Sequence, residues 1–412
     1  SDSTDRIAVV NTLSLERTEV IALPQGTPAQ QTSSTGIPLG VVSAPAMGYA
    51  VVTPQSQQPS PVQASQFPEG FALENDFIIA KFDHGGQLTS LFDKVNGREC
   101  VEPGTKANQF KLFDDNPVNF DAWDVDIYHL EKFNLVAPAH NAKIIEGGPL
   151  RASLAFEVVI SPESTLKQVV SLTAISPRLD FSTEVDWHEN HQFLKVEFPF
   201  NLRAPFATYE IQFGYLQRPT HFNNSWDMAR FEVCAHRWAD YSEPDYGVAL
   251  LNDSKYGYAV HGNVMRLSLL RSPKMPDPQA DMGQHQFRYA LLPHADNPLD
   301  AGVIEEGYRF NSPLLVYPTQ AEPQNQSFFQ VSGGSLILDT VKKAEDSDAI
   351  IVRLYEAHGK RGLCRLESPL PVTAAAQCNL LEIDEKPLAW ERNGIDIPYT
   401  PFQLITLKLK LR

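Results

Sequence analysis

Residues 153–160 read SLAFEVVI, and a comparable alternation of apolar and polar side chains recurs at 77–82 (FIIAKF) and 402–411 (FQLITLKLKL). Successive side chains of a strand point to opposite faces, so a period of two residues predicts half-buried strands. The 31 prolines and 23 glycines separate these runs, and sustained helical spacing is nearly absent. We therefore predict an all-β fold in which many short strands form several β-sandwiches.

Two changes of composition predict where the sandwiches are divided. Residues 53–69 (TPQSQQPSPVQASQFPE) are rich in Gln, Ser and Pro, which is typical of an exposed connector, and prolines again interrupt the strand rhythm at 311–326. We expect a small sandwich with its connector at 1–66, a large two-sheet supersandwich at 67–312 and a C-terminal sandwich at 313–412. No repeat of fixed period indicates a propeller or a solenoid.

The charge balance excludes two classes of partner. The chain has 50 acidic against 34 basic residues, a formal net charge of -16, so its surface should repel nucleic acid and anionic lipid. It has no apolar run of roughly 18 residues and no basic-then-apolar leader, which predicts no membrane span and a cytoplasmic location. The four cysteines are widely spaced, without the pairing that a metal site needs.

An acidic segment is the first candidate site. No Lys or Arg lies between Lys111 and Lys132, and five aspartates surround Trp123 there: Asp114, Asp115, Asp121, Asp124 and Asp126. Carboxylates accept hydrogen bonds from vicinal sugar hydroxyls, and an indole face stacks on a pyranose ring. A solvated acidic loop with Trp123 in the core explains the same composition, and the spacing does not follow a calcium-binding loop.

Two further segments carry polar residues of interest. His188, Glu189 and His191 lie close together, but residues three apart in a strand point to opposite faces, which favours structural roles over metal binding. The Pro-rich stretch from Arg271 to His294 is predicted to be a long loop in which Arg271, Asp281 and His285 are candidate sugar ligands. Zincin, nucleophile-elbow and phosphate-loop motifs are missing from the sequence, so we predict no catalytic residue, metal ligand or cofactor on this chain.

Seven segments, taken in order, resemble the C-terminal region of family 38 (class II) α-mannosidases, and most closely the vacuolar, cytosolic and bacterial branch. They span nearly the whole chain: VVNTLSLERTEVIALP, FALENDFIIAKFDHGGQLTSLFDKVNGREC, NQFKLFDDNPVNFDAWDVD, EVDWHENHQFLKVEFP, HRWADYSEPDYGVALLNDSKYGY, RSPKMPDPQADMGQHQFRYALLPH and VKKAEDSDAIIVRLYEAHG.

This resemblance implies a retaining glycosidase of α-linked mannose whose N-terminal catalytic domain supplies a zinc ion, an aspartate nucleophile and an acid/base carboxylate. Those motifs are absent here, so the chain alone is expected to be inactive. The resemblance implies that the β domains brace that catalytic domain and complete the rim of its active site. It places Asp121, Trp123 and Asp124 at this rim, with Arg271 beside them, as binders of a mannose-containing oligosaccharide.

Two other functions fit an all-β chain of this kind. One is a stand-alone carbohydrate-binding protein, which needs an exposed aromatic platform. The other is a mutarotase-like epimerase, because the central supersandwich is expected to resemble the galactose mutarotase fold, and this function needs a converging His and Glu pair. A portion of a mannosidase should instead carry a broad apolar patch that a catalytic domain, or a second copy in a homo-oligomer, would cover.

Overall fold

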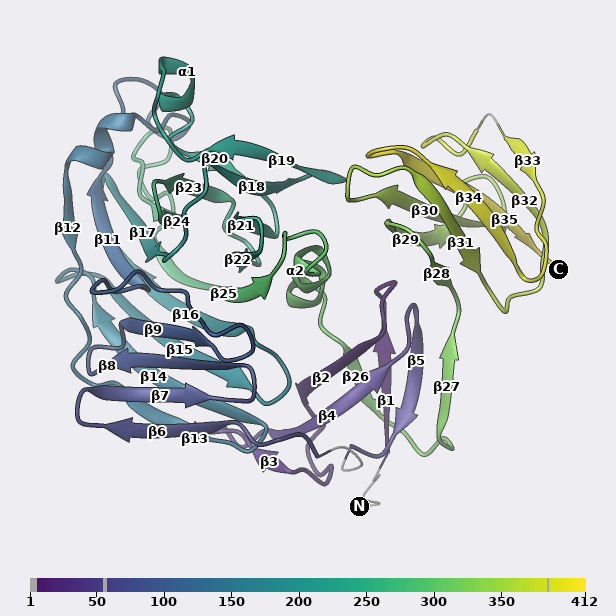
Figure 1. The fold of residues 1–412 in the computed structure, drawn as a ribbon, viewed down its shortest axis with the longest axis horizontal. Helices are drawn as coiled ribbons and strands as arrows, with labels where there is room; N and C mark the ends of the chain where they lie inside the picture. Colours follow the sequence, from purple (N-terminus) through teal and green to yellow (C-terminus); the bar gives the residue numbers. More distant parts are fainter. Residues whose placement is uncertain (1–5, 55–57, 384) are drawn as a thin grey trace.

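The computed structural model of the chain describes residues 6–54, 58–383 and 385–412. Within these ranges the strands form seven sheets with antiparallel pairing, arranged as three sandwiches (Figure 1). Helical segments are few and short: α1 (Ser225–Met228), α2 (Val303–Asn311) and a 3₁₀ helix, η2 (Ile127–Glu131). The prediction of an all-β fold built from several sandwiches is confirmed.

The N-terminal sandwich, in purple near the N-terminus in Figure 1, packs a four-stranded sheet against a three-stranded sheet. The strand orders are β26-β1-β5-β27 and β2-β4-β3. Ile7, Val9, Leu23 and Val42 are among the buried side chains between them. The strands are β1 (Ile7–Asn11), β2 (Arg17–Ala22), β3 (Gln31–Thr32), β4 (Pro38–Ala44), β5 (Gly48–Val52), β26 (Leu315–Pro318) and β27 (Gln324–Ser327).

Two of these strands come from far along the chain, and they correct the predicted boundary at 312/313. Val9 of β1 pairs with Val316 of β26, and Ala50 of β5 pairs with Asn325 of β27. Residues 315–327 therefore complete the N-terminal sandwich before the chain enters the last one. The prolines at 311–326 mark edge strands, where a missing N–H costs no sheet hydrogen bond.

The expected connector at 53–69 is also only partly irregular. Residues 55–57 lie outside the described ranges, whereas Gln63–Phe67 forms strand β6, which pairs with β7. The exposed, polar side chains of β6 are those of an edge strand, which composition alone does not distinguish from a linker.

The central sandwich combines sheets of five, six and nine strands around one continuous hydrophobic core. The five-stranded sheet contains β6 (Gln63–Phe67), β7 (Gly70–Glu74), β8 (Ile78–Asp83), β9 (Leu88–Asp93) and β10 (Arg98–Glu99). The six-stranded sheet contains β11 (Gln109–Asp114), β12 (Phe133–Leu135), β17 (Gln192–Pro199), β20 (Val233–Cys234), β23 (Gly257–His261) and β24 (Val264–Arg271).

The nine-stranded sheet is opposed to the other two and has the order β13-β14-β15-β16-β25-β22-β21-β18-β19. Its strands are β13 (Lys143–Gly147), β14 (Arg151–Val159), β15 (Thr165–Thr173), β16 (Leu179–Trp187), β18 (Phe206–Ile211), β19 (Gly214–Pro219), β21 (Trp238–Ser242), β22 (Tyr246–Asn252) and β25 (Gly283–Ala295). SLAFEVVI lies in β14 and the residue after it, and Leu154, Phe156 and Val158 point into the core as the alternation predicts.

The C-terminal sandwich follows, coloured green to yellow in Figure 1. It packs a three-stranded sheet against a five-stranded sheet, with Leu354, Leu366 and Leu407 among the core side chains. The strands are β28 (Gln330–Ser332), β29 (Leu336–Lys343), β30 (Ile350–Glu356), β31 (Gly362–Glu367), β32 (Val372–Cys378), β33 (Lys386–Leu388), β34 (Gly394–Tyr399) and β35 (Leu404–Leu411). Helix α2 lies between this sandwich and the central one.

Candidate functional site

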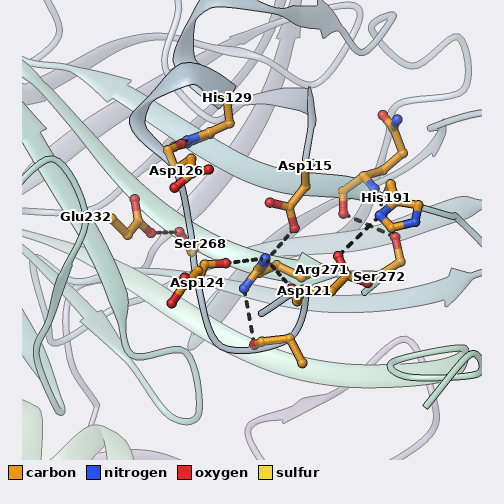
Figure 2. A network of polar contacts seen from close by, with 12 residues as sticks. Asp115, Asp121, Asp124, Asp126, His129, His191, Glu232, Ser268, Arg271 and Ser272 are labelled. Carbon is orange, nitrogen blue, oxygen red and sulfur yellow. Dashed lines mark hydrogen bonds and ion pairs between the residues drawn. The ribbon is translucent and has the colours of Figure 1, made fainter. Parts of the chain in front are cut away.

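Arg271 is the hub of the acidic segment. It is the last residue of β24, and its side chain enters the loop that links β11 to η2 (Figure 2). Nε donates to Asp115 Oδ2 at 2.6 Å, and the two terminal nitrogens donate to main-chain oxygens of Asp121 (3.2 Å), Ala122 (3.5 Å) and Asp124 (2.8 Å). Four of the five guanidinium N–H groups therefore have partners inside the protein.

The ion pair between Arg271 and Asp115 is buried, because their side chains are 16% and 2% exposed. Burial raises the pKa of Asp115, and the hydrogen bond and charge of Arg271 offset only part of that rise. Breaking such a pair from one side leaves an uncompensated buried charge, which costs about 3–5 kcal/mol. Arg271 thus orders the loop in this structure, and most of its guanidinium N–H groups have partners inside the protein.

Asp121 is the second anchor of the loop. Its Oδ2 accepts from the backbone N–H groups of Lys274 (2.5 Å) and Met275 (3.0 Å), and its Oδ1 lies 3.4 Å from Nδ1 of His191. Burial raises the pKa of Asp121, but the two backbone hydrogen bonds and the neighbouring cations lower it by more, so the net pKa is below its usual value. Asp121 joins the acidic loop to the loop after β24.

Trp123 and Asp124 form the free side of the same loop. Trp123 is 72% exposed, with its ring edge-on to Phe120 at 6.2 Å between centroids. The Asp124 carboxylate, which is partly buried, has no hydrogen-bond partner among the described residues. Beside them lies a groove of about 470 Å³ lined by Val118, Phe120, Asp121, Trp123, His191 and Met275, among others, which we call the Trp123 groove.

The remaining aspartates of the segment have partners elsewhere. Asp114 pairs with Lys132 and accepts from Gln192, and its pKa is lowered, chiefly by the Lys132 hydrogen bond. Asp126 accepts from the backbone of Val118 at 2.8 Å. The structure brings Asp121, Trp123, Asp124 and Arg271 together in one loop region, with Asp121 and Arg271 bonded within the protein and the side chains of Trp123 and Asp124 without such bonds in the described ranges. Trp123 does not fill the core.

His129 lies beneath this loop, on the first turns of η2. Its Nδ1 faces the carbonyl of Asp126 at 2.7 Å and must carry the proton, because a carbonyl only accepts. Its Nε2 is buried without a partner in the described part of the chain, among the rings of Phe113, Phe193 and Phe231. Burial, with Lys195 nearby, lowers the pKa of His129 to about 4.

A second recess of about 400 Å³ opens behind Arg271, and we call it the Lys255 recess. Glu232 on its wall accepts from the fully buried Lys195 at 2.6 Å and also from Ser268. The lining includes Val125, Glu232, Lys255, Tyr256, Arg271, Asp281 and His285. Asp281 and His285, both candidates from the sequence, therefore lie in this recess and not in the Trp123 groove. Sequence reasoning missed Glu232 and Lys255, although Lys255 stands in a dense polar segment at 235–258.

No group of three or more His, Cys, Asp or Glu side chains suited to a metal ion occurs in the ranges that the structure covers. His188 bonds Asp186 at 2.8 Å, while His191, with φ of 50°, turns toward Asp121. His294 bonds Asp240, on a neighbouring strand, at 2.7 Å. These residues do not fit a zinc site. None of the helices in the described ranges is long and apolar enough to cross a membrane.

Two family models match segments of this chain. The profile "Glycosyl hydrolases family 38 C-terminal domain" matches residues 73–279, and "Glycosyl hydrolases family 38 C-terminal beta sandwich domain" matches residues 335–407. The chain belongs to glycosyl hydrolase family 38, and the family resemblance found in the sequence is confirmed.

The chain is similar in sequence to curated α-mannosidases over nearly its whole length. It is 47% identical to "Alpha-mannosidase 2C1" of Homo sapiens over 98% of its length and 40% of the relative's. It is 36% identical to "Alpha-mannosidase G" of Dictyostelium discoideum, over 92% of this chain and 37% of that protein. The chain therefore spans about two fifths of the length of these relatives.

A solved structure shows the same fold. The α-mannosidase from Enterococcus faecalis V583 superposes with a TM-score of 0.77 over 99% of this chain and 57% of that one, at 16% sequence identity.

Proposed function

We propose that this chain is the C-terminal β portion of an α-mannosidase that acts on mannose-containing oligosaccharides, with the Trp123 groove at the rim of its active site. The observation that supports this most is the 47% identity to an α-mannosidase over 98% of the chain. The exposed ring of Trp123, which lines the groove, adds an aromatic surface for a sugar, and the neighbouring Asp124 carboxylate has no hydrogen-bond partner within the described residues.

In this proposal each side chain has a separate role. The indole of Trp123 stacks on the C–H face of a mannose ring, and Asp124 accepts hydrogen bonds from vicinal hydroxyls. Asp121 and Arg271 hold the loop in place without touching the sugar. Retaining glycosidases need two carboxyl groups about 5–5.5 Å apart on either side of the scissile bond. We assign that pair, and the zinc that the resemblance implies, to the part of the relatives that this chain does not span, and we expect the chain alone to be inactive.

The partner in this proposal is a catalytic domain of the same protein. Val118, Phe120, Trp123, Tyr128 and Met275 are each more than 60% exposed and lie on the acidic loop, on η2 or on the loop after β24. Large apolar side chains gathered in this way mark an interaction surface. Covering part of this patch with a catalytic domain would enclose the Trp123 groove from the other side.

The test compares two equally exposed tryptophans in the protein that carries both this chain and its catalytic domain. Trp123→Ala and Asp124→Ala should each lower kcat/KM for an α-mannoside by roughly tenfold or more, because each removes a contact to the sugar. Trp226→Ala is the matched control, since Trp226 is 77% exposed on α1 and should leave kcat/KM unchanged. Wild-type kinetics in both groove variants, with intact folding, would remove the groove from the active site.

A stand-alone carbohydrate-binding protein is the second candidate, favoured by the exposure of Trp123 in the chain as described. It predicts that no catalytic domain binds to the apolar patch. An epimerase is less well supported, because Glu232, the glutamate that lines the same recess as His285, is already held by Lys195 and Ser268.

A further inference from the structure

The Lys255 recess lies next to the Trp123 groove but on the other side of the Arg271 side chain. Val125 and Arg271 line the recess, while Asp121 and Trp123, from the same loop, line the groove. Arg271 donates to the carbonyls of Asp121 and Asp124, so the wall between the two hollows is held by hydrogen bonds (Figure 2). Residues of one loop therefore line both hollows.

Lys255 contributes unused hydrogen-bond donors to the recess. Its backbone N–H is fixed by Asn252 Oδ1 at 2.6 Å, and its ammonium lies 4.6 Å from the centre of the Phe287 ring. The ammonium donates no hydrogen bond to any described residue. Burial lowers the pKa of Lys255, and the charges of Asp281 and Asp253 offset only part of this effect. A partly buried ammonium with unused donors is suited to ligand oxygens.

Acceptors lie on the other walls. Asp281 is held with φ of 60°, and its carboxylate makes no hydrogen bond within the described ranges. Glu232 is fixed by Lys195 and Ser268. His285 donates from Nε2 to the carbonyl of Asp281 at 2.6 Å, which leaves Nδ1 as an acceptor. The recess thus combines one fixed carboxylate, Glu232, one unbonded carboxylate, Asp281, and one free cationic donor, Lys255.

Tyr256 adds an aromatic surface at the edge of the recess. Its side chain is 51% exposed, and its ring is tilted against His236 at 5.9 Å between centroids. A half-exposed ring next to hydrogen-bonding groups suits a ligand with one apolar face and several hydroxyls. Two carboxylates in the lining disfavour phosphate or sulfate, and the many polar groups disfavour an apolar ligand.

We propose that the Lys255 recess binds one neutral pyranose unit, so that the chain holds two neighbouring sugar units of an oligosaccharide, one on each side of Arg271. Lys255 donates to the ring hydroxyls, Asp281 accepts from them, and Tyr256 packs on the sugar face. This inference rests on the proposed function, because it extends the Trp123 groove by one sugar position. It makes Lys255 and Tyr256 determinants of the length of substrate that the protein prefers.

The test titrates the full chain by calorimetry with methyl α-mannopyranoside and with an α-linked mannobiose. Lys255→Met keeps the aliphatic stem and removes only the donor, and Tyr256→Ala removes the aromatic surface. Both variants should bind the disaccharide at least tenfold more weakly. Lys343→Met is the matched control, since Lys343 is exposed on the C-terminal sandwich and should bind as wild type does.

A Trp123→Ala background separates this proposal from the proposed function. There the recess should still bind one methyl α-mannopyranoside, and adding Lys255→Met should abolish that binding. If Trp123→Ala abolished sugar binding while Lys255→Met and Tyr256→Ala bound as wild type does, the proposal for the recess would be overturned. The proposal for the groove would stand. If Lys255→Met abolished sugar binding while Trp123→Ala bound as wild type does, the result would support a sugar site in the recess. It would count against a sugar site in the groove.

A chemical readout checks the recess without relying on affinity. Mass spectrometry after limited acylation should show Lys255 protected by the glycoside and Lys343 unprotected. Unchanged labelling of Lys255 at a saturating glycoside concentration would overturn the proposal. Tighter binding of inorganic phosphate than of the glycoside, lost in Lys255→Met, would overturn it too, because it would identify an anion site.

Discussion

The two sides of the acidic loop are built in opposite ways. On the inner side Asp115, Asp121 and Arg271 are largely buried, and each has partners within the protein. On the outer side Trp123 is mostly exposed, and Asp124 has no side-chain partner in the described chain. Asp121 and Asp124, only three positions apart, therefore differ in their bonding. The inner side of the loop is fixed to the protein, whereas the side chains of the outer side make few contacts within it. Substitutions should separate stability from binding accordingly.

The inner side should show the largest effect. Arg271→Met should lower the free energy of unfolding by about 3–5 kcal/mol, because Asp115 remains buried without its countercharge. Equilibrium urea unfolding, followed by tryptophan fluorescence, measures this. Lys360→Met, which removes the cation of an exposed ion pair with Asp300, is the control and should change little.

A double variant sharpens the same comparison. Asp115→Leu combined with Arg271→Met should recover part of the lost stability, because replacing both members of a buried ion pair is milder than removing one. If Arg271→Met alone unfolded at the wild-type urea concentration, the ion pair would not be what holds the loop.

His129, beneath the loop, should give the next largest effect and make stability depend on pH. Its pKa is about 4 in the folded chain against about 6.5 when unfolded, so the unfolded state binds the proton first as the pH falls. Its contribution is fully present above pH 6.5, and up to about 3 kcal/mol is lost between pH 6.5 and 4.

The measurement compares unfolding free energies of the wild type and His129→Gln across that range. Their difference should shrink or reverse as the pH falls, because the variant lacks the titrating ring. If the free energies of unfolding of the two proteins changed with pH in parallel, His129 would have the same pKa in the folded and the unfolded state.

The outer side should show the smallest effect on stability. Trp123→Ala should change the free energy of unfolding by no more than about 0.5 kcal/mol, because the ring is exposed and packs only edge-on against Phe120. The same variant is expected to weaken sugar contacts strongly. A loss of 2 kcal/mol or more would show that the ring supports the loop, and the two sides would not be separable.

The sequence predicted the strands well because their signal is local. The alternation in residues 153–160 needs only the chain itself, and β14 buries Leu154, Phe156 and Val158 accordingly. The crowded aspartates were also visible, but their partners were not. Arg271 is 156 positions from Asp115 in the sequence, so no local pattern indicates that the two form an ion pair. Nor does any local pattern indicate that the hydrogen-bond donors of Arg271 are used within the acidic loop.

Long-range pairing also explains what was missed elsewhere. Glu232 has no motif around it, and its role depends on Lys195 and Ser268 from two other strands. The domain division at 312/313 followed the prolines, whereas Leu315–Pro318 belongs with β1 because their backbones pair. Composition locates interruptions of a strand pattern, but it does not tell which distant strand fills the open edge of a sheet.

That closing of the N-terminal sandwich has a consequence for how the molecule is made. During translation β1 and β5 leave the ribosome before the segment that covers both edges of their sheet, which follows only after the entire central sandwich. For that period the nascent chain carries two unpaired strand edges, which favour wrong pairing or aggregation. Chaperone dependence and misfolding on truncation should therefore concentrate in residues 7–52, which are distant in sequence from the acidic loop around Trp123.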